Sequence, residues 1–224
     1  MNDTTLQLTG NETGAQLDQL TAAFEGLPEG KSMEVVSAND PSALLPPFQD
    51  RFWGAFDWYP LENGPEQWRV YLRRVPEVRR NRGLKEFMST DHTRCDELYA
   101  EAENAARAGD AAATRRLFQS FETGMVHHFG MEENGFFPAF EQATGMTQGP
   151  TMVMRMEHRQ MLGIISQMSQ ALKQEDLQAW LRGGSTLMVL MRQHNIKEEQ
   201  MLYPMGEMHL GGVDGLLRAM QKTL

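Results

Sequence analysis

The chain has 224 residues, of which 41% are hydrophobic and 23% are charged, an ordinary composition for a globular protein with one large or two small domains. Its formal net charge of −9 argues against general binding to nucleic acid or anionic lipid, since both are negatively charged. No stretch approaches the roughly 18 uninterrupted apolar residues of a membrane span, and the first residues do not resemble a secretory signal. Because the chain has one cysteine, Cys95, no intrachain disulfide can form. We therefore expect a cytoplasmic protein that binds neither membranes nor nucleic acid.

Residues 1–75 predict a small two-layer α+β domain. Its clearest element is a strand near residue 70, where Trp68, Val70 and Leu72 alternate with polar neighbours. A period of two is typical of a half-buried strand. The whole region is expected in the order β-α-β-α-β-β, with strands at 6–8 and 33–36, helices at 15–24 and from 40, and a further strand through Trp53, Phe56 and Trp58.

Residues 76–85 are expected to form a linker rich in arginine. Seven of the 21 basic residues of the chain fall in or just before it, namely Arg69, Arg73, Arg74, Arg79, Arg80, Arg82 and Lys85. The favoured interpretation is a solvated hinge. The alternative is a strip that docks an acidic partner or the following domain.

Residues 86–224 predict an up-down-up-down four-helix bundle, so that the chain as a whole is mostly α. Apolar and potential ligand residues recur there at helical spacing, as in the stripe Met154, His158, Met161, Ile165, Met168 and the stripe Leu187, Met191, His194, Glu198, Met201. Breaks at 109–110, 145–150 and 174–176 are short enough to join antiparallel neighbours. The tail from 213 to 224 predicts a short additional helix.

Two segments of the bundle read alike and obey the pattern HxxxEExx[FL][FY]P. They begin at His128 and His194, which are 66 residues apart (194 − 128), and 36 residues before each lies another histidine, His92 or His158. An acid, Asp91 or Glu157, precedes each of these. The spacing predicts a duplicated two-helix unit that closes around something that needs nitrogen and oxygen donors.

Residues four apart in a helix lie on nearly the same face, so each HxxxE pair presents an imidazole and a carboxylate to one point. That face is the apolar stripe, where an unpaired carboxylate is costly and requires a compensating cation. The sequence therefore predicts two metal ions, held and bridged by His92, His128, Glu132, His158, His194 and Glu198.

The donor types narrow the choice of metal. Closed structural zinc sites favour cysteine ligands, and this chain has no spare cysteine. Imidazole and carboxylate ligands with open positions suit iron, manganese or zinc, and a redox metal makes open positions useful for O2 or NO. Iron is the first choice.

Several neighbouring residues leave alternatives open. Glu133 and Glu199 are rivals to the preceding glutamates as ligands, although the i+4 spacing favours the first of each pair. Asp91 and Glu157 are interpreted as surface acids at the start of a helix, or else as partners that orient a histidine. The remaining positions are His127, expected at the surface or as an outer group, Cys95, a core residue or a thiol near the metals, and Asp96, a possible seventh ligand.

The paired motifs resemble the hemerythrin-like HHE cation-binding family over about residues 84–210. The resemblance implies a di-iron bundle whose ligands are the six residues named above. Oxygen-carrying members have a fifth histidine one turn after that of the third helix, where this chain has Leu162. Four His and two Glu is the set of the cytoplasmic di-iron proteins linked to nitric oxide and to damaged iron centres.

The region before the bundle is similar in outline to the TusA-type sulfur carriers, but it has no cysteine, so sulfur transfer is not implied. The complete arrangement resembles the NorA-type di-iron proteins, which implies binding of nitric oxide at a diferrous site and buffering of NO during denitrification or nitrosative stress. Binding without turnover is favoured over catalysis. The alternatives are an enzyme that reduces NO or repairs iron–sulfur clusters, and a module that binds or senses O2.

Overall fold

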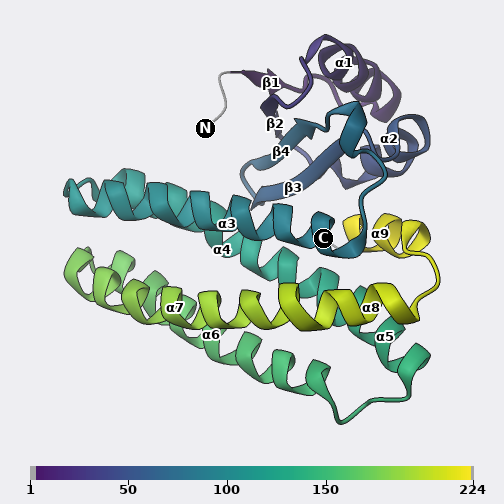
Figure 1. Ribbon diagram of the computed structural model, residues 1–224. Helices are drawn as coiled ribbons and strands as arrows, with labels where there is room; N and C mark the ends of the chain where they lie inside the picture. The colour runs from purple at the N-terminus through teal and green to yellow at the C-terminus, as the bar shows by residue number, and fades with distance from the viewer. Residues whose placement is uncertain (1–3, 223–224) are drawn as a thin grey trace.

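The computed structural model describes residues 4–222 and shows a small α+β domain placed against a long helical bundle (Figure 1). The predicted fold class is confirmed. The order of elements in the small domain is also the predicted one, with two helices between the first three strands.

The small domain is built on a four-stranded sheet in the order β1-β2-β4-β3. Strand β1 runs parallel to β2, and the other two pairs are antiparallel. The strands are β1 (Thr5–Gln7), β2 (Ser32–Ser37), β3 (Phe56–Asn63) and β4 (Trp68–Arg74). The helical elements are α1 (Thr13–Gly26), the 3-10 turn η1 (Pro41–Leu44) and α2 (Leu45–Phe52).

The two faces of the sheet are buried against different partners. Phe56 and Trp58 point into the domain's own core with Phe24 of α1 and Phe48 of α2. Because side chains alternate along a strand, Tyr59, the residue after Trp58, faces the other way and packs into the core of the bundle. The sheet therefore has α1 and α2 on one side and the bundle on the other.

One strand boundary differs from the prediction. Trp53 was expected in the third strand, but α2 runs to Phe52 and a turn at Gly54, with a φ of +76°, separates it from β3. Trp53 instead lies beneath Arg218 of the C-terminal helix, 4.6 Å from the guanidinium to the ring. An aromatic residue at the end of a helix gives the same sequence signal as one that begins a strand.

The bundle consists of four long helices in the predicted up-down-up-down order (Figure 1). They are α3 (Leu84–Arg107), α4 (Ala111–Met131), α6 (Pro150–Lys173) and α7 (Leu177–Lys197). The 66-residue repeat extends to the helix caps. Asp110 accepts a hydrogen bond from the Ala113 amide at 2.9 Å, and Asp176 accepts one from the Ala179 amide at 2.8 Å.

The helical path that begins as α4 continues past Pro138, and the path that begins as α7 continues past Pro204. Each passes through one π-helical turn, η3 (Glu132–Phe136) or η4 (Glu198–Leu202), and then continues as α5 (Phe137–Thr144) or α8 (Tyr203–His209). Proline has no N–H to donate, and its ring clashes with the carbonyl group four residues earlier. The wider π-helical turn before each proline accommodates the missing hydrogen bond and relieves the clash. The turn also shifts the helical phase. Met201, predicted to face inward, is 45% exposed, and Leu202 is buried in its place.

The segment between the two domains is largely exposed but is tied to the small domain by Arg82. It contains the 3-10 turn η2 (Glu77–Arg79), and the buried Arg82 donates to Asp57 of β3 at 2.6 Å. Upstream, Arg69 is bonded to Glu34 at 2.6 Å. Two of the predicted basic residues, Arg69 and Arg82, thus have carboxylate partners in the small domain.

The predicted C-terminal helix is α9 (Asp214–Gln221), while residues 223 and 224 of that prediction lie outside the described part of the chain. It rests against the small domain, where Gln49 donates to Gln221 at 2.9 Å. Between residues 4 and 222, none of the helices combines the length and apolarity that a bilayer crossing requires.

Candidate metal centre

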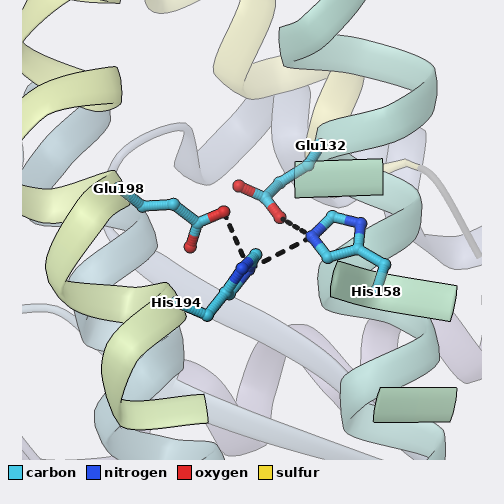
Figure 2. A group of neighbouring side chains, drawn as sticks. All are labelled: Glu132, His158, His194 and Glu198. Carbon is cyan, nitrogen blue, oxygen red and sulfur yellow. Dashed lines mark hydrogen bonds and ion pairs between the residues drawn. The ribbon is translucent and has the colours of Figure 1, made fainter. Parts of the chain in front are cut away.

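The six side chains predicted as ligands converge inside the bundle. His92 comes from α3, His128 from α4, His158 from α6 and His194 from α7, while Glu132 and Glu198 open the two π-helical turns. All six are buried, and His92 is the most exposed of them at 6%. Figure 2 shows four of the six, with the carboxylates of Glu132 and Glu198 directed toward the imidazoles of His158 and His194.

The donors form two overlapping clusters, each with its ligand atoms within 4.8 Å of one another. One contains Glu132, His158, His194 and Glu198, and the other contains His92, His128 and Glu198. In each cluster two histidines face each other through their Nε2 atoms at 3.2 Å. Glu198 belongs to both clusters.

Each histidine is held through its other nitrogen. The Nδ1 atoms of His92 and His158 lie 2.7 Å from Glu199 and Glu133, respectively. Those of His128 and His194 lie 2.9 Å from Asp91 and Glu157, respectively. A proton on Nδ1 that is donated to a carboxylate leaves the Nε2 lone pair free and aims it into the centre, which is how metal-binding histidines are usually oriented.

These four acids correct part of the sequence interpretation. Asp91 is fully buried and is no surface acid, and Glu157 is also tied to a histidine. Glu133 and Glu199 lie outside both clusters and orient the histidines of another helix. The signal was present in the sequence, since all four acids obey the 66-residue repeat, but only the folded chain shows which histidine each one faces.

Tyr203 joins the two glutamates. Its buried hydroxyl lies 2.9 Å from Glu132 Oε1 and 3.1 Å from Glu198 Oε2, so that its proton can be donated to either. The same oxygen is 3.5 Å from His92 Nε2. The repeat equivalent of Tyr203 is Phe137, which has no hydroxyl, and neither residue was predicted as a partner of the glutamates. The hydroxyl that distinguishes the two residues is the signal that was missed.

Whether a cation fits the site can be judged from the two carboxylate oxygens that Tyr203 does not contact. Glu132 Oε2 and Glu198 Oε1 are buried and make no hydrogen bond within residues 4–222. They lie 3.2 Å from His158 Nε2 and 2.9 Å from His194 Nε2, respectively, without the geometry of a hydrogen bond. Buried, unpartnered anionic oxygens beside inward-facing imidazole nitrogens are what a cation site requires. The donor set therefore fits two divalent cations.

The charges within the site favour protonated histidines when no cation competes. Burial would lower the pKa of His92, but Glu198 and Glu199 outweigh it and raise that pKa to about 10. Burial is likewise outweighed at His194, where mainly Glu198 raises the pKa to about 9. Burial raises the pKa of Tyr203 well above its usual value, and the two glutamates add to this. Tyr203 therefore stays a neutral hydrogen-bond donor.

Three neighbouring residues lie apart from the donor clusters. His127, expected at the surface or as an outer group, is 4% exposed, because β3 covers that face of α4 and its ring meets Tyr59 edge-on at 6.0 Å. Burial lowers its pKa to about 4. Cys95 is buried, and its thiol has a raised pKa, chiefly because of that burial. Asp96 is in neither cluster found among the described residues.

A groove of about 660 Å³ between α3 and α7 reaches the edge of the centre at His92. Its walls include Asp96, Arg192 and Glu199. The groove meets the three-donor cluster, which has one protein donor fewer than the other cluster. It is therefore a route by which a small molecule can approach.

Comparison with known proteins gives two family matches. Residues 84–206, more than half of the chain, match the hemerythrin HHE cation binding domain. Residues 5–74 match an uncharacterized conserved protein family (DUF2249). No match was found among curated proteins or among solved structures.

Proposed function

This chain belongs to the hemerythrin HHE cation-binding family, and we propose on that basis that its centre holds two iron ions and that the ferrous pair binds nitric oxide. Metal binding itself follows from the family and from the two donor clusters. The identity of the metal, the number of ions and the choice of NO are the proposal. Its biological role would be to lower or buffer NO, without turnover.

The single observation that carries the proposal is the donor count. Four imidazoles and two carboxylates are shared between two clusters, so that neither ion would have a complete shell of protein ligands. Ferrous iron in such a setting would supply an electron-rich centre with open positions for a diatomic ligand. The His92 and His128 side, with three donors, is the proposed position for NO.

The surroundings support a small uncharged ligand. Leu162 lies one turn beyond His158 on α6, packs with the apolar core and contributes no further nitrogen donor. Tyr203 places a hydroxyl 3.5 Å from His92 Nε2, where it can donate to a ligand bound beside that histidine. The buried aromatic rings of Phe129 and Phe137 stack on His158 and close off the four-donor side.

The small domain enters the proposal through the arrangement of the whole chain. A domain similar in outline to TusA-type carriers, joined to such a bundle, is the arrangement of the NorA-type proteins. The only cysteine of the chain, Cys95, lies in the bundle, so sulfur transfer by the small domain is not proposed.

Metal analysis and anaerobic titration with NO test the proposal. The expected result is two irons per chain and, in the reduced protein, a new visible absorption band that saturates with NO. His92→Ala should weaken this response, whereas His209→Ala, at an exposed histidine of α8, should leave it unchanged. Tightly held zinc with no spectral change on adding NO would contradict the proposal. Steady production of N2O would replace binding with NO reduction.

A further inference from the structure

The two halves of the bundle hold their equivalent histidines differently. The acid that orients His194 is Glu157, whose side chain is 25% exposed and pairs with Lys197, which is 41% exposed. The acid that orients His128 is Asp91, which is fully buried and accepts a hydrogen bond from Arg94 Nε at 2.7 Å. One histidine is thus supported by an ion pair near the surface and the other by an ion pair inside the protein.

Arg94 lies where the two domains meet. Its guanidinium stacks over the ring of Tyr59 at 4.5 Å, and Tyr59 belongs to β3 of the small domain. Figure 1 shows β3 lying over α3 and α4, and contacts between β3 and α4 are extensive. Arg94 Nη1 is buried and makes no hydrogen bond to any described residue, while the guanidinium faces the aromatic ring of Tyr59.

The sequence has adapted to this arginine only in the half that faces the small domain. A side chain at Gly124 of α4 would place its Cβ 2.9 Å from Arg94 Nη2, so any larger residue there would push the guanidinium from its present position. Sixty-six residues later, Arg94 and Gly124 correspond to Gln160, which is exposed, and Leu190, which packs on the apolar core. The pair Arg94 and Gly124 therefore departs from the repeat in a region that the small domain covers.

We propose that the small domain supports one side of the metal centre, with Tyr59 holding Arg94, Arg94 holding Asp91, and Asp91 holding His128. The chain of contacts is continuous, from the 4.5 Å stacking through hydrogen-bond distances of 2.7 and 2.9 Å. Arg94 and Tyr59 are positioning residues, because neither touches the donor clusters. The small domain would thus have a role in metal retention. This inference rests on the proposed function only in requiring that His128 be a metal ligand.

The physical reason is that a buried carboxylate that loses its cationic partner is strongly destabilised where it stands and turns away from that position. Loss of Arg94 would therefore free Asp91, and His128 would lose the partner that fixes its ring. Changes to the partner that orients a metal-binding histidine typically cost about 10- to 100-fold in metal affinity. On the other half, solvent can replace Lys197 beside Glu157.

The test uses full-length protein loaded with Fe(II) and measures the rate of iron transfer to the chelator ferrozine. Arg94→Met is expected to release iron at least about tenfold faster. The matched change in the other half, Lys197→Met, should stay within about twofold of the unaltered chain, because that pair is solvent-exposed. Equal rates for the two variants would overturn the proposal.

A second pair of variants isolates the small domain. Tyr59→Leu removes the ring beneath Arg94 and is expected to speed iron release about three- to tenfold, from loss of the cation–π contact. Tyr59→Phe keeps the ring and loses only a hydroxyl that has no partner among the described residues, so it should match the unaltered chain. If Tyr59→Leu also matches the unaltered chain, the small domain does not act on the centre.

The visible spectrum of the Co(II)-loaded protein separates positioning from general destabilisation. Arg94→Met and Tyr59→Leu should change the cobalt absorption bands, whereas a purely structural loss would lower the melting temperature and leave the bands unchanged. Arg94→Lys retains the charge and should give an intermediate release rate if Arg94→Met does not fold. An unaltered chain that holds iron but does not respond to NO would refute only the NO proposal, while a chain that holds no cation would refute both.

Discussion

The two halves of the bundle, α3 to α5 and α6 to α8, share the parts that a cation needs and differ in what surrounds them. The facing histidines and their four carboxylate partners repeat with the same distances. Arg94 and Tyr203 have no such counterparts, since the equivalent residues are Gln160 and Phe137. The comparison shows that duplication preserved the donor set, while single substitutions gave each side its own environment.

The consequence is an asymmetric centre built from symmetric parts. On one side, the Tyr203 hydroxyl, which is within hydrogen-bond distance of Glu132 and Glu198, lies beside His92. The groove reaches the centre at the same histidine. On the other side, stacked rings enclose His158. An asymmetric pair can hold one ion firmly while the other remains open to an incoming ligand.

Substitution of the two buried glutamates, Glu132 and Glu198, gives the largest expected effect. Glu198 belongs to both clusters and Glu132 to one, although Glu132 Oε2 also lies 3.6 Å from His128 Nε2. We expect Glu198→Gln to lose both metal ions and Glu132→Gln to retain about one per chain, because a neutral amide is a poor replacement for a bridging carboxylate. Elemental analysis after gel filtration measures this.

Glu103→Gln is the matched control, since Glu103 pairs with Arg107 on the outside of α3. Its metal content should equal that of the unaltered chain. Equal losses in Glu132→Gln and Glu198→Gln would show that the two glutamates are equivalent and that the asymmetry of the clusters has no effect on binding.

Metal binding should release protons, one from each half. The pKa of about 10 for His92 and of about 9 for His194 mean that both rings are protonated at neutral pH without a cation. The Nε2 atoms must lose those protons to bind metal, so affinity should rise with pH by up to about tenfold per unit for each proton displaced, levelling off at pH 9–10. Calorimetry in two buffers of different ionisation enthalpy counts the protons.

The stability of the metal-free chain should depend on pH in the opposite direction to metal affinity: it should fall as the pH rises. Because the folded pKa of each histidine is raised above its ordinary value of 6.5, the resulting stabilisation of the fold is complete below that value and is lost as the pH rises through 9–10.

The variant His92→Gln tests the proton count. Because it lacks the imidazole of residue 92, it should release one proton fewer on metal binding. Metal affinity that falls between pH 7 and 9 would contradict the assignment of these histidines.

The exchange of Tyr203 and Phe137 tests the second difference between the halves. Tyr203→Phe should weaken metal binding by about tenfold, because both glutamates lose their shared donor. Phe137 occupies the equivalent place and stacks on His158 with ring centroids 5.7 Å apart. Adding Phe137→Tyr to the first change should restore part of the affinity by supplying a hydroxyl from the other half.

Competition with a chelator of known affinity measures all three proteins. A double variant that binds no better than Tyr203→Phe alone would show that the repeat does not extend to the environment of these rings.

The smallest effect on the centre is expected at the far end of the bundle. At Gly184 a Cβ would lie 1.9 Å from the Tyr99 hydroxyl, so Gly184→Ala should destabilise the fold by about 1–3 kcal/mol through overpacking. Gly163 has open space around it, and Gly163→Ala should stabilise α6 by about 0.5–1 kcal/mol. Urea denaturation measures both, and the metal content should not change. Similar stabilities would place α3 and α7 farther apart than described.

Much of this molecule could be predicted from the sequence because the repeat is written in ligand residues. The fold class and the convergence of the six donors follow from spacings of 4, 36 and 66 residues, since helical geometry turns those intervals into shared faces. The helix caps at Asp110 and Asp176 repeat in the same way. A helix cap depends on residues that are close together in the chain, so it can be predicted without knowledge of the tertiary fold.

What could not be predicted depends on packing between distant segments. Asp91 and His127 were expected outside the core because nothing in a single helix shows that β3 will cover it. Met201 was placed inward because a period of 3.6 cannot reveal a π-helical turn. The hydrogen bonds of Tyr203 to the two glutamates were not predicted, because these partners lie 71 and 5 residues away in the chain.

The most direct test of the central claim is anomalous diffraction at the iron absorption edge from crystals of the iron-loaded, full-length protein. We predict two anomalous peaks inside the bundle, one beside the Nε2 atoms of His92 and His128 and the other beside those of His158 and His194. A single peak, or peaks outside this group of six side chains, would contradict the account.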